Sequence, residues 1–130
     1  MNGQNFGNAG GTYKGIAHDV VRLVGDDKYP IWVYMEAGDG WLQPSIFQNR
    51  PEVVQWCGSD PEFFELVMDA WYAQNIEMGW ATMEMEIDDG RFKTRFRYPG
   101  EVDPDGINAG ERRQLLLDTR YGDKAVIYLD

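Results

Sequence analysis

Apolar and polar positions follow two periods along this chain, and the shorter period predicts strands. Residues 31–37, "IWVYMEA", alternate between two faces, as successive side chains of a strand do. A turn follows at "GDG" (38–40), and "WLQPSIF" (41–47) is expected to return as the neighbouring strand. Pro44 lacks an amide hydrogen, which predicts an edge or a bulge there. "EVVQW" (52–56) predicts a short third strand, and "AVIYLD" (125–130) a strand that could add an edge.

The stretch "MEMEIDDGRFKTRFRY" (83–98) predicts a hairpin, because Asp89-Gly90 is a preferred centre for a two-residue turn. Cross-strand pairs are worth about 0.2–1 kcal/mol each. We therefore interpret the change of charge sign mainly as register control. The expected pairs are Ile87 with Phe92 and Met83 with Phe96 on one face, and Glu86 with Lys93 and Glu84 with Arg95 on the other.

The longer period predicts three helices. The first is capped by Thr12, the second starts at a Ser59–Glu62 capping box and stops at Gly79, and the third covers 111–122 and docks through its leucines. The fold class is α+β: an antiparallel sheet, built as a meander plus the hairpin, with helices packed on one face. At 130 residues this is one domain, expected at 12–130, after a flexible Gly/Asn-rich tail at 1–11.

Charge is distributed unevenly along the chain. Twenty-two acids against twelve bases give a net charge of −10, which repels nucleic acid and anionic membranes and attracts basic partners. Residues 29–90 contain twelve of the acids, one base and all five tryptophans. Either this is an ordinary solubilising surface, or the acids and aromatics together mark a protein-binding surface, since aromatic side chains anchor interfaces.

Two candidate partner-binding patches follow from these patterns. The first is the outer face of the first strand, which nothing in the sequence obviously covers; the alternative is a sheet buried on both faces. The second is a stripe on the second helix, for which the alternative is an ordinary solvated helix face. Their members are Trp32, Tyr34 and Glu36 in the first patch, and Glu62, Glu65, Asp69 and Tyr72 in the second.

Residues for catalysis or metal binding are few. His18 and Cys57 are the only residues of their types, so no zinc set and no Cys–His pair of recognisable spacing is present. We expect no enzyme activity, no metal and no cofactor. The single cysteine, the lack of a long apolar run and the polar N-terminus indicate a soluble protein of the cytoplasm.

Four segments follow one another in an order typical of one protein family: "YKGIAHDVVRLVGDDKYPIWVYMEA", "FELVMDAWYAQN", "GWATMEMEIDDGRFKTRFRY" and "GERRQLLLDTRYG". Over residues 13–122 the chain resembles the YezG-like immunity proteins of bacterial polymorphic toxin and contact-dependent growth inhibition systems. The resemblance implies an α+β fold and an antitoxin that binds a cognate toxin domain, often a nuclease with a basic active site.

The resulting hypothesis is an immunity protein that neutralises a basic nuclease toxin by stoichiometric binding through an acidic, aromatic surface. Two alternatives stay open. An acidic adaptor or secretion chaperone would bind a partner without abolishing its activity, and a small hydrolase using a carboxylate pair would show turnover and need no partner. The sequence does not determine the oligomeric state, because the "AVIYLD" end can pair within the fold or between chains.

Overall fold

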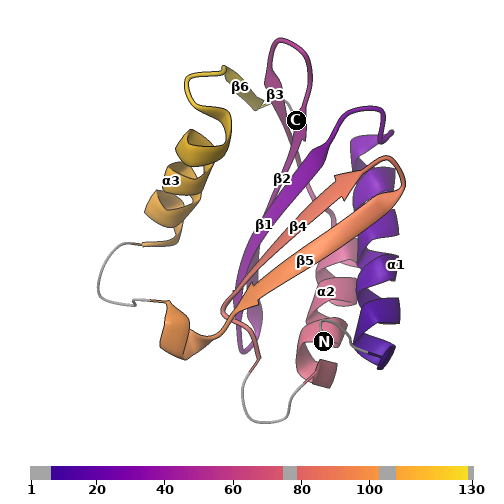
Figure 1. The fold of residues 1–130 in the computed structure, drawn as a ribbon. Coiled ribbons are helices and arrows are strands. Elements are labelled where there is room, and N and C mark those ends of the chain that lie inside the picture. The colour runs from indigo at the N-terminus through magenta and orange to yellow at the C-terminus, as the bar shows by residue number, and fades with distance from the viewer. Residues whose placement is uncertain (1–6, 75–78, 103–107, 129–130) are drawn as a thin grey trace.

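A single six-stranded sheet forms the middle layer of the protein, with helices on both of its faces (Figure 1). The computed structural model describes residues 7–74, 79–102 and 108–128. It has the α+β class that the sequence predicts. Its helices are α1 (Gly7–Val24), α2 (Pro61–Gln74) and α3 (Ala109–Tyr121), with a 3-10 turn, η1 (Pro99–Glu101).

The sheet is mixed, although most of its pairs are antiparallel. In chain order its strands are β1 (Ile31–Gly38), β2 (Trp41–Asn49), β3 (Val54–Cys57), β4 (Thr82–Asp88), β5 (Arg91–Arg97) and β6 (Val126–Tyr128). Across the sheet the order is β5-β4-β1-β2-β3-β6. The prediction of a purely antiparallel sheet is wrong at one position, because β6 runs parallel to β3. Strand β6 follows α3 in the chain, and it pairs with β3 at the edge of the sheet opposite to β5.

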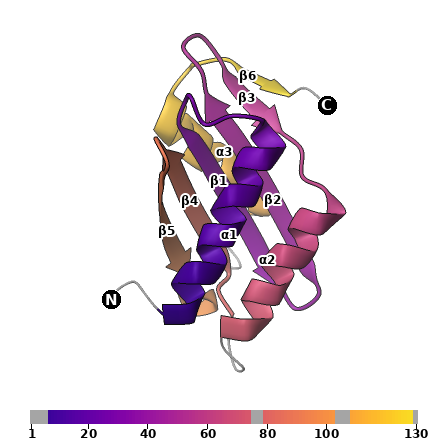
Figure 2. The same cartoon turned by 90° about the vertical axis from the view of Figure 1, so that its right-hand side faces the viewer.

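Helices α1 and α2 lie side by side on one face and bury most of the apolar core (Figure 2). Ile31, Val33 and Met35 point toward these helices, as their alternation predicts. The helices contribute fully buried side chains that include Ile16 and Phe63. Burying a side chain of this size contributes about 1.5–3 kcal/mol, so this face supplies most of the hydrophobic stabilisation.

Helix α3 lies on the opposite face, so the expectation that the helices all pack on one face is wrong (Figure 1). It docks through its leucines, as predicted, but only partly. Leu117 is buried and Leu116 is half-buried, whereas Leu115 is exposed. Beneath them lie Trp32, Tyr34 and Phe47, which form a second cluster. Helices therefore cover both faces of the sheet at β1. This is the alternative given above for the first candidate patch, in which the sheet is buried on both faces.

The β4–β5 hairpin has the predicted register. Ile87 pairs with Phe92, Met83 with Phe96, Glu86 with Lys93, and Glu84 with Arg95. Asp89 and Gly90 form the turn, and both have positive φ, as a two-residue hairpin turn of this kind needs. Pro44 is also explained: it pairs with Met35 of β1, but β3 pairs with β2 only from Ile46 onward. Its other side thus lies at an unpaired edge of the sheet.

The helix ends differ from the predictions in detail. Helix α1 begins at Gly7, so residues 7–11 belong to it rather than to the tail, while residues 1–6 lie outside the described residues. Asp60, rather than Ser59, caps α2, because its carboxylate accepts a hydrogen bond from the Phe63 amide at 2.9 Å. Helix α2 is described as far as Gln74, and Gly79, where it was predicted to stop, is not helical; residues 75–78 between them lie outside the described residues. The last residues of "AVIYLD" (129–130) also lie outside the described residues.

Candidate partner-binding surface

The first predicted patch is not on the surface. Trp32, Tyr34 and Glu36 are 1%, 4% and 4% exposed, so the expectation that nothing covers this face is wrong. The indole nitrogen of Trp32 donates to Glu84 at 3.1 Å, and the Arg120 guanidinium lies 5.1 Å from the centre of its ring. These three side chains hold α3 in place, and a partner could reach them as a surface only if α3 moved away.

Glu36 is the centre of the polar contacts beneath α3. Arg112 of α3 donates two hydrogen bonds of 2.8 Å to its carboxylate, and the Tyr34 hydroxyl donates another. Burial alone would raise the pKa of Glu36, but these hydrogen bonds and the charge of Arg112 outweigh it and hold the pKa below its usual value. Burial and the hydrogen bond to Glu36 raise the pKa of Tyr34. The carboxylate is therefore ionised and paired at neutral pH.

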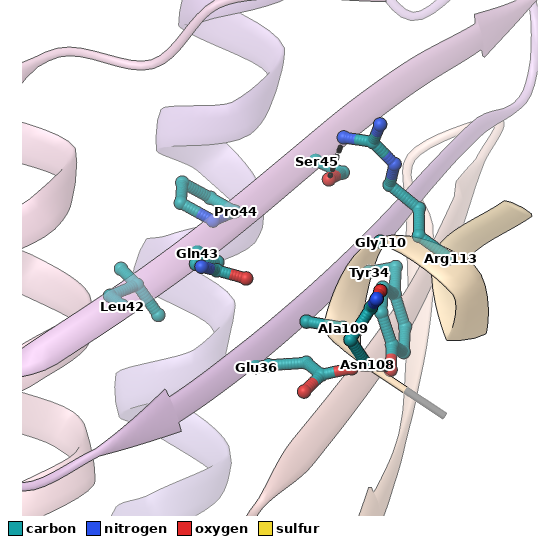
Figure 3. Close-up of a pocket in the computed structure, with 10 residues that line it drawn as sticks. All are labelled: Tyr34, Glu36, Leu42, Gln43, Pro44, Ser45, Asn108, Ala109, Gly110 and Arg113. Atoms are coloured by element: carbon teal, nitrogen blue, oxygen red, sulfur yellow. Dashed lines mark hydrogen bonds between the residues drawn. The ribbon is translucent and has the colours of Figure 1, made fainter. Parts of the chain in front are cut away.

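A pocket of about 680 Å³ opens beside this ion pair, between the N-terminus of α3 and strands β1 and β2 (Figure 3). Tyr34 and Glu36 line it from the sheet, and Asn108, Ala109, Gly110 and Arg113 line it from α3. The Arg113 guanidinium reaches toward Ser45, to which it makes a long hydrogen bond of 3.4 Å (Figure 3). Among the described lining residues Glu36 is the one carboxylate, and it is already paired with Arg112, so these residues do not supply the two separated carboxyl groups that acid–base hydrolysis uses.

The second predicted patch lies open to solvent on α2. Glu62, Glu65 and Asp69 are exposed, and no cation among the described residues forms an ion pair with any of them. The N-terminus of the helix favours Glu62, because acids in the first turn interact well with the helix dipole. The same explanation does not cover Asp69, which lies two turns further along. The stripe therefore presents negative charge that the fold does not use.

Tyr72, the fourth member of the stripe, is 49% exposed but also has a structural role. Its hydroxyl donates to Asp39 at 2.7 Å and accepts from the Gly40 amide at 2.8 Å, which ties the end of α2 to the β1–β2 turn. The hydrogen bond to Asp39 raises the pKa of Tyr72. About half of the residue stays exposed to solvent, and the turn it holds leads directly into Trp41.

Sequence reasoning missed two exposed aromatic side chains in this region. Phe64, on α2, is 41% exposed, and Trp41, at the start of β2, is 46% exposed. The signal for Phe64 was its position beside Phe63: successive helix residues point about 100° apart, and Phe63 takes the core position. We use the name α2 surface for the set made up of Trp41, Glu62, Phe64, Glu65, Asp69 and Tyr72.

Other kinds of site find little support in the part of the chain that the structure describes. No group of three or more His, Cys, Asp or Glu side chains there is placed to hold a metal ion. No helix in that part is long and apolar enough to cross a membrane. Comparison of the chain with protein-family models and with curated proteins found no match, so the α2 surface has to be interpreted from its own chemistry.

Proposed function

We propose that this protein is a cytoplasmic immunity protein, which neutralises a toxin domain by stoichiometric binding through the α2 surface. The observation that carries the proposal is the set of exposed acids on α2, unpaired within the described residues, together with exposed aromatic rings on the same helix and at the start of β2. Aromatic side chains anchor interfaces, and fixed negative charge favours a basic partner. A basic nuclease is the toxin class that this chemistry fits best.

The net charge of −10 supports fast association with such a partner. Complementary charge raises association rates to about 10⁸–10⁹ M⁻¹s⁻¹ at low salt in the best cases, and an antidote benefits from speed. The acids would then set the rate and the orientation of docking, whereas Trp41, Phe64 and Tyr72 would supply the contact area that slows dissociation.

The test is co-expression with the toxin domain encoded beside the gene, with cell survival and a one-to-one complex as readouts. The variant Glu65→Lys/Asp69→Lys reverses two charges of the α2 surface. The control variant Glu52→Lys/Asp123→Lys makes the same change of net charge at exposed positions on other elements. We expect the first variant to bind at least tenfold more weakly at low salt and the control to bind nearly as well as the wild type.

Three results would count against the proposal. Equal loss of affinity in both variants would show that only the net charge matters, and no loss in either would remove the acids from the interface. A complex that forms while the toxin stays fully active would favour an acidic adaptor or secretion chaperone instead. Salt separates the two contributions, since only the charge-dependent part of the affinity falls as ionic strength rises.

A further inference from the structure

Strand β5 is an outer edge of the sheet. Among the residues that the structure describes, its one neighbouring strand is β4, and no strand pairs with its other side. The Arg97 carbonyl accepts a hydrogen bond from the Ala81 amide at 2.7 Å, so the backbone of Arg97 faces the β4 side. Hydrogen-bonding direction alternates along an antiparallel strand. The N–H and C=O groups of Phe92, Thr94 and Phe96 therefore point away from the sheet.

The side chains of this edge strand have an unusual charge distribution for so acidic a protein. Every second residue is an exposed cation, and all of these cations lie on the α3 side of the sheet. None of them forms an ion pair within the described residues, because Glu86 pairs with Arg120 and Glu84 accepts from Trp32 instead. The members of this β5 basic row are Arg91, Lys93, Arg95 and Arg97.

Strand β4 already shows which kind of strand fits against β5. It places the acids Glu84, Glu86 and Asp88 opposite the cations, and the apolar residues Met83 and Ile87 opposite the phenylalanines. The free side of β5 offers the same two rows, since Phe92 and Phe96 are only half-buried. A second strand with alternating acidic and apolar residues could therefore place its acids beside the cations and its apolar residues beside the phenylalanines.

We propose that β5 is a docking edge for an extended acidic segment of a partner protein, which adds to the sheet as a seventh strand. Strand addition to a free sheet edge takes affinity from main-chain hydrogen bonds and specificity from alternate side chains. A second copy of this chain does not fit through its own β5, because antiparallel pairing of two such strands would place cations opposite cations. This surface is distinct from the α2 surface, and the proposal does not depend on the toxin.

The test uses the full chain and a fluorescently labelled peptide of alternating Glu and Val, about eight residues long, a usual strand length. A peptide with Gln in place of Glu is the control, since a basic peptide would be attracted to the acidic α2 surface. We expect the anisotropy of the acidic peptide to rise and saturate, and that of the neutral peptide to rise much less at the same concentrations. Amide hydrogen exchange of Phe92, Thr94 and Phe96 should slow when the acidic peptide binds, because their N–H groups gain partners.

Two variants separate backbone pairing from simple charge attraction. Thr94→Pro removes one outward N–H without removing a hydrogen bond to β4, and Thr94→Ala is its matched control. Lys93→Gln/Arg95→Gln neutralises two members of the β5 basic row, and Arg50→Gln/Lys124→Gln removes the same charge beside β3 and β6, at the opposite edge of the sheet. We expect Thr94→Pro and Lys93→Gln/Arg95→Gln each to bind the acidic peptide at least tenfold more weakly, and both controls to bind it as the wild type does.

Several outcomes would overturn the proposal. These are no binding of the acidic peptide, equal binding of both peptides, or binding that leaves the exchange of the three amides unchanged. Wild-type affinity in a folded Thr94→Pro variant would also overturn it. If that variant does not fold, the hydrogen-exchange measurement on the wild type is the deciding test. A dimer in sedimentation that Thr94→Pro abolishes would assign the edge to a second copy instead.

Discussion

The two faces of the sheet are covered by helices in different ways. On one face, α1 and α2 bury a continuous apolar cluster. On the other, α3 lies over a smaller cluster of aromatic side chains and is anchored by charged groups, with the Arg112–Glu36 pair at its centre. A pocket of about 680 Å³ remains beside that pair. The first face is filled by non-polar contacts, whereas the second depends on a few specific polar ones.

The contrast between the two faces indicates which part of the structure can rearrange without unfolding the whole protein. Hydrophobic burial is spread over many side chains and is non-directional, so no single contact controls the α1–α2 face. A buried ion pair behaves differently, because loss of one partner leaves an uncompensated charge in a poorly solvated place. We therefore expect α3 to respond locally to changes in charge or pH, while the α1–α2 face responds only to loss of packing.

The largest effect is expected on the α1–α2 face. Phe63→Ala removes a fully buried ring from α2 and should lower the free energy of unfolding by about 3–5 kcal/mol. Phe64→Ala, at the neighbouring exposed position, should change it by less than about 0.5 kcal/mol. Urea unfolding followed by circular dichroism measures both. Similar losses in the two variants would mean that the core of α2 is not where the structure places it.

A smaller and more local effect is expected on the α3 face. Arg112→Met leaves Glu36 buried without its ion-pair partner and should cost about 3 kcal/mol. Hydrogen exchange should accelerate in α3 and stay slow in α1 and α2. Glu36→Gln/Arg112→Met should cost less than the single variant, because no uncompensated charge remains. Equal acceleration in all three helices would show that the two faces unfold as one unit.

The smallest effect is expected from acid. Because the pKa of Glu36 in the folded protein lies below its ordinary value of 4.5, the ion pair stabilises the fold above that pH. This contribution is lost as the pH falls below 4.5 and through the lowered pKa. Tryptophan fluorescence, to which Trp32 beneath α3 contributes together with the four other tryptophans, should report the loosening. Other acids titrate in the same range, so the measured quantity is the difference between the wild type and Glu36→Gln, which should lose less stability on acidification.

Short-range pattern was enough for much of the fold. The register of β4–β5 follows from the Asp89-Gly90 turn and from the alternation beside it, since a slip of one residue would turn the apolar set outward. The core side of α2 follows from its helical period. The exposed acids of the α2 surface follow from the same period, because a stripe opposite the core has to face solvent. Each of these depends on residues close together in sequence.

Local pattern along the chain was thus sufficient to predict the helices and strands, the hairpin register and the exposure of one of the two candidate patches. The path of α3 to the other face, the parallel pairing of β6 with β3 and the burial of Trp32, Tyr34 and Glu36 became known from the folded structure alone. These features depend on contacts between residues far apart along the chain. Arg112 and Glu36, for example, are 76 residues apart. Local periodicity predicts that each helix has an apolar stripe, but it does not determine which face of the sheet that stripe covers.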